Sequence, residues 1–111
     1  MTTTVQKQVL INARALIANP QHWTTRTLAC GADGRHVEWH DRSASKWCAV
    51  GAIYRAAYDL VGNQKEAMRI GDKVANSICR RRWFGTALPT VNDAQGHAAV
   101  LAVFDKALAA A

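Results

Sequence analysis

The chain has 111 residues and a mass of 12.1 kDa, which suffices for one domain with a modest core but not for two independent ones. Half of its residues are hydrophobic, which excludes a disordered chain and the collagen-like and low-complexity classes. Lys and Arg exceed Asp and Glu by 14 to 8, and the resulting charge of +6 favours an acidic partner, although it serves solubility equally well.

The first predicted helix runs from about Thr4 to Asn19 and carries apolar residues at helical spacing on one face. Pro20 ends this helix, because a residue that precedes proline avoids the α-helical region. The predicted buried face consists of Val5, Val9, Ala13, Leu16 and Ile17.

A short β-hairpin is predicted next, because the segment after the first helix loses the helical period. Strand-forming residues occupy 25–30, polar and apolar residues alternate over 35–39, and Gly31-Ala32-Asp33-Gly34 between them is typical of a turn. Since an isolated hairpin is only marginally stable, we expect Trp23 and Trp39 to anchor this one to the helices.

The second predicted helix begins near Ser43 or Ser45, which are both good N-cap residues, and ends near Gly62, which suits a C-terminal cap. Because it is apolar nearly all round, we expect it at the centre of the fold. A third helix is predicted over residues 63–83. Its predicted core residues are Ala67, Ile70, Val74 and Ile78.

The last predicted helix begins between Thr90 and Asp93, where the residues fit a capping box with Asn92 or Asp93 as alternative caps. Its predicted buried residues are His97, Val100, Leu101, Phe104 and Leu108. The sequence therefore predicts a mainly α-helical single domain over residues 1–111, with about four helices and a short β-hairpin between the first two.

Four motifs carry a resemblance to a known family. They are Asn19-Pro20-Gln21-His22-Trp23, Ala32-Asp33-Gly34, Trp47-Cys48-Ala49-Val50-Gly51-Ala52 with Arg55-Ala56 downstream, and Asn92-Asp93-Ala94-Gln95-Gly96-His97, which continues into the apolar residues 100–107. With them the chain resembles a family of short bacterial and phage proteins defined as a domain of unknown function. The resemblance covers almost the whole chain and implies a single domain, no established activity, and a phage or mobile-element origin. The triplet Arg80-Arg81-Arg82 and the histidines His36 and His40 lie outside the shared pattern.

The cysteines Cys30, Cys48 and Cys79 are odd in number and lack framework spacing, which argues against a secreted disulfide scaffold. The N-terminal residues lack the apolar core of a signal peptide, and no apolar stretch is long enough to span a bilayer. We therefore expect a cytoplasmic protein with reduced thiols.

Cys48, His97 and Asp93 are the residues that best suit catalysis by a thiol hydrolase or transferase. Cys48 falls in the first turn of its predicted helix, where free backbone N–H groups and the helix dipole stabilise a thiolate. His97 can accept the thiol proton, and Asp93, four residues earlier on the same predicted helix, can orient the imidazole. Alternatively, Cys48 is a small buried residue, His97 is half-buried and Asp93 caps a helix.

A zinc-stabilised module is a further hypothesis, because cysteines and histidines recur with the spacing Cys-x5-His-x3-His-x7-Cys. The four residues are Cys30, His36, His40 and Cys48. No Cys-x2-Cys pair accompanies them, and the alternative is two surface histidines on a hairpin arm. No glycine-rich phosphate loop or other cofactor motif occurs, so we expect no cofactor.

A basic segment is the third candidate site, for nucleic acid or another acidic partner. It comprises Lys65, Arg69, Lys73, Arg80, Arg81, Arg82 and Trp83. Regularly spaced cations can follow phosphates, and an aromatic ring can stack on a base. Glu66 and Asp72 dilute this charge, and a solvated helix face is the alternative interpretation.

These observations favour a small binding or regulatory protein over an enzyme, with nucleic acid or an acidic protein surface as its partner and no membrane contact. A cysteine-dependent hydrolase or transferase built on Cys48, His97 and Asp93 is the first alternative, and the zinc-stabilised structural module is the second. Alanine-rich helices can also pack against a second copy of the chain, which leaves a homo-oligomer open.

Overall fold

The computed structural model describes residues 3–78 and 88–111. Its longer helices are α1 (Thr4–Ile17), α2 (Ala49–Val61), α3 (Gln64–Ile78) and α5 (His97–Ala110), and its shorter elements are η1 (Pro20–His22), β1 (Ala29–Cys30), β2 (Lys46–Trp47), α4 (Leu88–Thr90) and η2 (Val91–Gln95). This architecture confirms the predicted mainly helical fold with a hairpin between the first two long helices. Within these ranges, no helix is long and apolar enough to cross a membrane.

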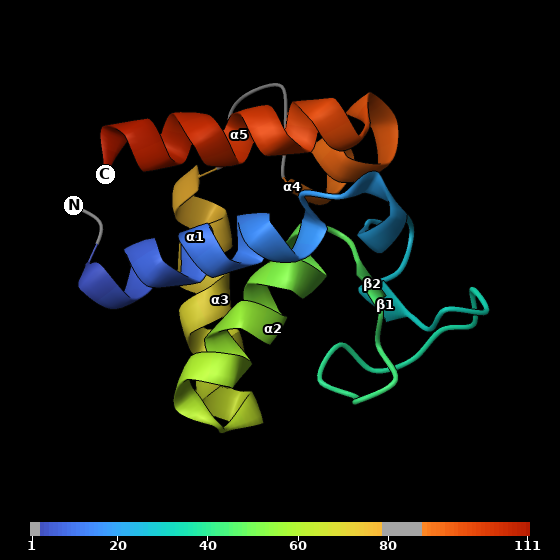
Figure 1. The fold of residues 1–111 in the computed structure, drawn as a ribbon. Coiled ribbons are helices and arrows are strands. Elements are labelled where there is room, and N and C mark those ends of the chain that lie inside the picture. The colour runs from blue at the N-terminus through green and yellow to red at the C-terminus, as the bar shows by residue number, and fades with distance from the viewer. Residues whose placement is uncertain (1–2, 79–87) are drawn as a thin grey trace.

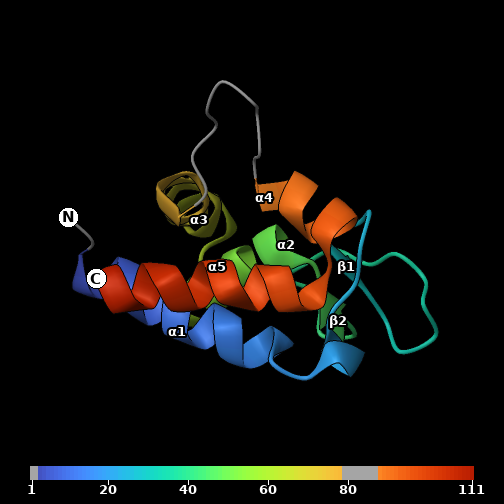
Figure 2. The same ribbon diagram turned by 90° about the horizontal axis from the view of Figure 1, so that it is seen from above.

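Helix α2 lies at the centre of the fold, as its nearly all-round apolar sequence predicts (Figure 1). It packs against α1 on one side and α3 on the other, and α5 lies along α1 in both views (Figures 1 and 2). The largest fully buried side chains come from all four long helices and include Leu10, Ile53, Val74 and Phe104. A single core therefore joins α1, α2, α3 and α5.

The contact between α2 and α3 depends on a glycine. A Cβ atom at Gly71 would lie 2.4 Å from Cδ1 of Tyr54, so the absence of a side chain lets the two helices approach. The Tyr54 hydroxyl donates a hydrogen bond to Asp72 Oδ1, and burial together with this carboxylate raises the pKa of Tyr54. Gly62, with a φ of 71°, ends α2 in the left-handed conformation that its predicted capping position requires.

The second long helix begins later than Ser43 or Ser45, and that part of the prediction is wrong. Residues 46–47 form β2 instead, because they pair with β1 in an antiparallel ladder in which Ala29 faces Trp47. Cys48 is consequently the N-cap of α2 rather than a first-turn residue. Serine N-cap propensity is a local preference, and here the ladder overrides it.

The hairpin itself has a different second strand from the one predicted. Residues 35–39 touch β1 through an isolated bridge between Cys30 and His36, whereas the ladder partner is β2. Trp39 is buried and Trp23 is partly buried against the core, so both tryptophans anchor this region as expected.

The predicted last helix is interrupted. Gly96 has a φ of 93°, which separates η2 from α5, and Thr90 makes no side-chain capping bond. Asp93 and His97 therefore do not share one continuous helix. At the other end of the chain Val5, predicted to be buried, is 49% exposed, because it lines an open groove between α1, α2 and α3.

Candidate functional site

The N-terminus of α2 is held by two side chains. The backbone N–H of Ala49 donates to Asn92 Oδ1 at 2.9 Å, and the backbone N–H of Gly51 donates to Cys48 Sγ at 3.3 Å. The first turn of any helix has N–H groups without partners inside the helix, and these bonds satisfy two of them. The first turn of α2 also packs directly on the backbone of Leu28, whose carbonyl accepts a hydrogen bond from Cys48 N.

Asn92 joins this helix terminus to the rest of the fold. It is 1% exposed, and its Oδ1 accepts a second bond from Trp23 Nε1 at 2.7 Å. Its Nδ2 donates to the carbonyl of Thr24 and to Asp93 Oδ1. Every hydrogen-bonding position of this buried amide is therefore occupied, as a polar group in a core requires.

Asp93 restrains an unusual backbone conformation. Arg26 has a φ of 65°, in the left-handed region that costs a non-glycine residue about 1 to 3 kcal/mol. The Arg26 N–H donates to Asp93 Oδ1 at 3.0 Å, and bonds from Asn92 and Arg26 hold the pKa of Asp93 below its usual value.

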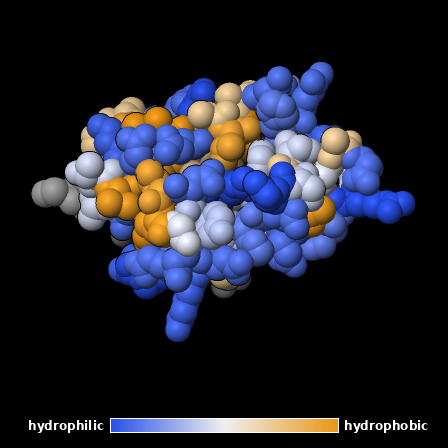
Figure 3. Space-filling view, turned by 60° about the horizontal axis from the view of Figure 1, so that its bottom comes forward, coloured by the Kyte–Doolittle hydropathy of each residue, from blue (hydrophilic) through white to orange (hydrophobic). Residues whose placement is uncertain are grey.

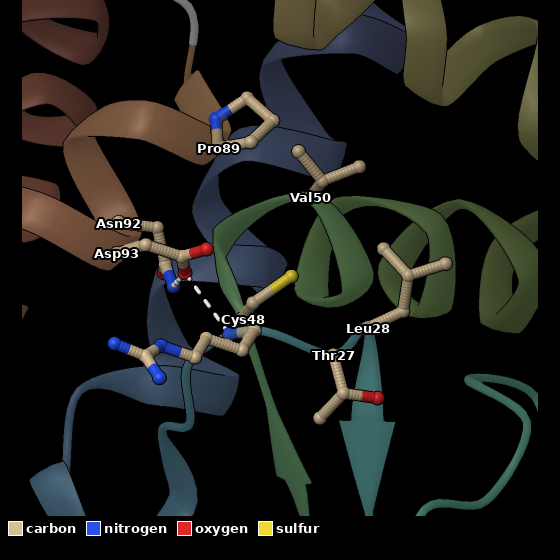
Figure 4. Close-up of a pocket in the computed structure, with 8 residues that line it drawn as sticks. Thr27, Leu28, Cys48, Val50, Pro89, Asn92 and Asp93 are labelled. Carbon is tan, nitrogen blue, oxygen red and sulfur yellow. Dashed lines mark hydrogen bonds between the residues drawn. The ribbon is translucent and has the colours of Figure 1, made fainter.

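These residues surround a pocket of about 270 Å³, here called the Cys48 pocket. Its lining residues are Arg26, Thr27, Leu28, Cys48, Val50, Pro89, Asn92 and Asp93. The Cys48 sulfur points into a hollow bordered by the apolar side chains of Leu28, Val50 and Pro89, with Asp93 on its other side (Figure 4). The structure thus brings Cys48 and Asp93 together.

His97 is placed elsewhere, at the first position of α5. Its Nε2 donates to the carbonyl of Ile17 at 2.6 Å, its ring packs on Trp23, and it does not line the Cys48 pocket. Burial raises the pKa of the Cys48 thiol, and the Asp93 carboxylate adds to that rise. A protonated thiol beside a weakly basic carboxylate suits helix capping better than nucleophilic attack.

The four candidate zinc ligands also make separate contacts. His36 Nδ1 is hydrogen-bonded to Thr27 Oγ1, and His40 packs on Trp39 and lies next to Gln64. Cys30 and Cys48 are buried free thiols. In the part of the chain that the structure describes, no three His, Cys, Asp or Glu side chains are grouped to hold a metal ion.

Three cations of the basic segment share the solvent-facing side of α3. Lys65, Arg69 and Lys73, here called the α3 basic face, are all exposed, opposite the buried Ile70 and Val74. Arg69 forms an ion pair with Glu66. The other members of the segment, Arg80, Arg81, Arg82 and Trp83, lie outside the described residues.

A family model matches residues 1–110, and the description of that family is "family of unknown function (DUF6197)". The chain belongs to this family. Membership in DUF6197 extends over all the elements described above and carries no assigned activity. No curated protein and no solved structure matches the chain.

The sequence does not reveal the roles of the two residues that organise the site in this DUF6197 member, Asn92 and Arg26. Asn92 does act as a cap, but for α2 rather than for the helix that follows it. The left-handed Arg26 had no signal in the sequence, because arginine is not a residue type that prefers this conformation. The sequence shows the Asn92-Asp93 pair but not the residues that contact it.

Alkylation of Cys48 should require alkaline pH. Because burial raises its pKa, the thiolate fraction stays small at neutral pH, and the alkylation rate should rise only above the usual thiol range. Mass-spectrometric mapping of iodoacetamide adducts against pH measures this. Asp93→Asn removes the nearby negative charge and should shift the profile to lower pH. A wild-type midpoint at or below the ordinary thiol value would contradict this and revive a catalytic role.

Proposed function

We propose that this protein is a small intracellular binding or regulatory module that engages an acidic macromolecule through the α3 basic face. The observation that carries the proposal is the exposure of Lys65, Arg69 and Lys73 on one side of one helix. The carboxylate of Glu66 neutralises one of these charges, which leaves a surplus of two. An exposed cluster of this sign attracts polyanions and polyacidic surfaces.

A second acid, Asp72, lies on the same helix and lowers the net charge of α3 to +1. Its Oδ1 accepts a hydrogen bond from the Tyr54 hydroxyl at the α2–α3 contact. In the described ranges, four arginines form salt bridges, namely Arg14, Arg35, Arg55 and Arg69, and no salt bridge involves Lys65 or Lys73. The ammonium groups of these two lysines are thus available to a partner. The free thiols of Cys30 and Cys48 suit a reducing, intracellular compartment.

The double substitution Lys65→Gln/Lys73→Gln should weaken binding to an acidic probe by about tenfold and reduce its salt dependence. The probes are a short DNA duplex and poly-glutamate, each titrated by fluorescence anisotropy at about 50 and 200 mM salt. We expect wild-type protein to bind at least one of them at low salt and to lose affinity steeply as salt rises.

A charge-matched control separates this face from net charge. Arg42→Gln/Lys106→Gln removes the same two charges from exposed positions outside α3 and should leave binding nearly unchanged. Equal losses of affinity in both double variants would show that the overall charge of the protein, rather than the α3 basic face, causes the binding. Absence of binding to both probes at low salt would refute the proposal.

A further inference from the structure

An open groove of about 410 Å³ borders the α3 basic face, between the start of α1, the end of α2 and α3 itself. Val5, Val61 and Ile70 form an apolar floor, while Arg69 and Lys73, with Glu66, form its charged side. The groove therefore combines an apolar surface with part of the basic face in one continuous site.

Two of the three apolar residues in this floor are exposed, whereas Ile70 is buried. Val5 is 49% exposed and Val61 is 38% exposed, whereas Val9, one turn further along α1 on the same predicted stripe, is 0% exposed. On the face of the molecule that Figure 3 shows, areas of hydrophobic surface are bordered by hydrophilic residues. Exposed apolar side chains that adjoin a concave site are typical of recognition surfaces.

We infer that the groove binds a short acidic segment of a partner protein, with an apolar side chain of that segment seated between Val5 and Val61. This inference rests on the proposed function and narrows the partner to a peptide. Carboxylates of the segment would pair with Lys73, which lines the groove, and with Lys65, which lies outside its lining, eight residues and therefore about 12 Å away along α3. An extended peptide covers that distance in about four residues.

Charge and shape favour an acidic peptide in this groove over a nucleic acid or a second copy of the chain. A nucleic-acid backbone would use the cations but gain nothing from Val5 and Val61. A second copy of the chain, with its charge of +6, would bring like charges together at a symmetric interface. An acidic segment with an apolar anchor matches both the floor and the side of the groove.

The experiment is a selection of random peptides of about a dozen residues, displayed on their own mRNA, against the immobilised full chain. We expect the enriched peptides to carry net negative charge together with Leu, Ile, Met or Phe. The best peptide is then titrated by fluorescence anisotropy against wild type and two matched variants of α1. Val5→Ser changes the groove, and Ile11→Ser removes a similarly exposed residue, 42% accessible, that does not line it.

Val5→Ser should weaken peptide binding about fivefold to tenfold, whereas Ile11→Ser should not change it. Enrichment without acidic and apolar residues, or equal effects of the two variants, would overturn the inference. If the DNA duplex binds through Lys65 and Lys73 while no peptide is enriched, the inference fails and the proposed function stands; if nothing binds, both fail. The inference would also be overturned if the protein bound phosphatidylserine vesicles more tightly than the best peptide, or if it formed a dimer that Val5→Ser dissociates.

Discussion

Replacing Asn92 with alanine is expected to lower the free energy of unfolding by about 3 to 4 kcal/mol, a large share of the stability of a domain of this size. The substitution leaves Trp23 Nε1, the Ala49 N–H and the Thr24 carbonyl without their partner. The Ala49 N–H is buried and keeps the cost of desolvation, about 1 to 3 kcal/mol, while the half-buried Trp23 and Thr24 groups keep part of that cost. Urea unfolding followed by tryptophan fluorescence measures the change as a lower midpoint.

Two variants test whether the network of Asn92 causes this loss. Asn76→Ala, at an exposed position of α3, should change stability by less than about 0.5 kcal/mol. Asn92→Asp keeps the acceptor for Trp23 and Ala49 but loses the donor to Thr24 and places a second carboxylate beside Asp93, so it should also destabilise. Similar midpoints for Asn92→Ala and Asn76→Ala would show that the network contributes little.

Gly51→Ala should destabilise the fold by about 3 kcal/mol or more, or prevent folding. A Cβ atom at Gly51 would lie 1.9 Å from the carbonyl oxygen of Leu28, and that oxygen belongs to the backbone, which cannot rotate away as a side chain can. Leu28 O also accepts the hydrogen bond from Cys48 N, so any shift disturbs the start of α2. Thermal unfolding followed by circular dichroism measures the loss.

Two other glycines calibrate this result. Gly34→Ala should cost about 1 kcal/mol, because its φ of +83° disfavours a side chain although no atom lies within 4 Å of the added Cβ. Gly71→Ala meets the Tyr54 ring, which can move, and should fall between the two. A Gly51→Ala protein as stable as Gly34→Ala would contradict the close approach of Leu28.

The fold could be predicted where the chain repeats a local pattern. The core residues of α3 follow the helical period, and Ala67, Ile70 and Val74 are buried as that period requires. The period failed at Val5, because it reports which face of a helix is apolar but not whether another element covers it. The N-cap preference of serine, which predicted a helix start at Ser43 or Ser45, also failed, because pairing of β2 with β1 overrode it.

One candidate site could be predicted from local spacing, and another depended on the tertiary structure. Spacing along one helix placed Lys65, Arg69 and Lys73 together, because residues four apart share a face wherever the helix lies. Cys48, Asp93 and His97 depended on how separate segments meet, and the structure gathers the first two and directs His97 to Ile17. The predicted single helix through Asp93 and His97 breaks at Gly96.

The sequence by itself determined the helical class, the apolar central helix and the basic face of α3, because these depend on neighbours within a few residues. Only the tertiary structure decided the cap of α2, where Asn92 reaches Ala49 across 43 residues, and the groove beside Lys73. Such contacts form when distant segments pack, and their energies depend on burial and geometry that no local pattern contains.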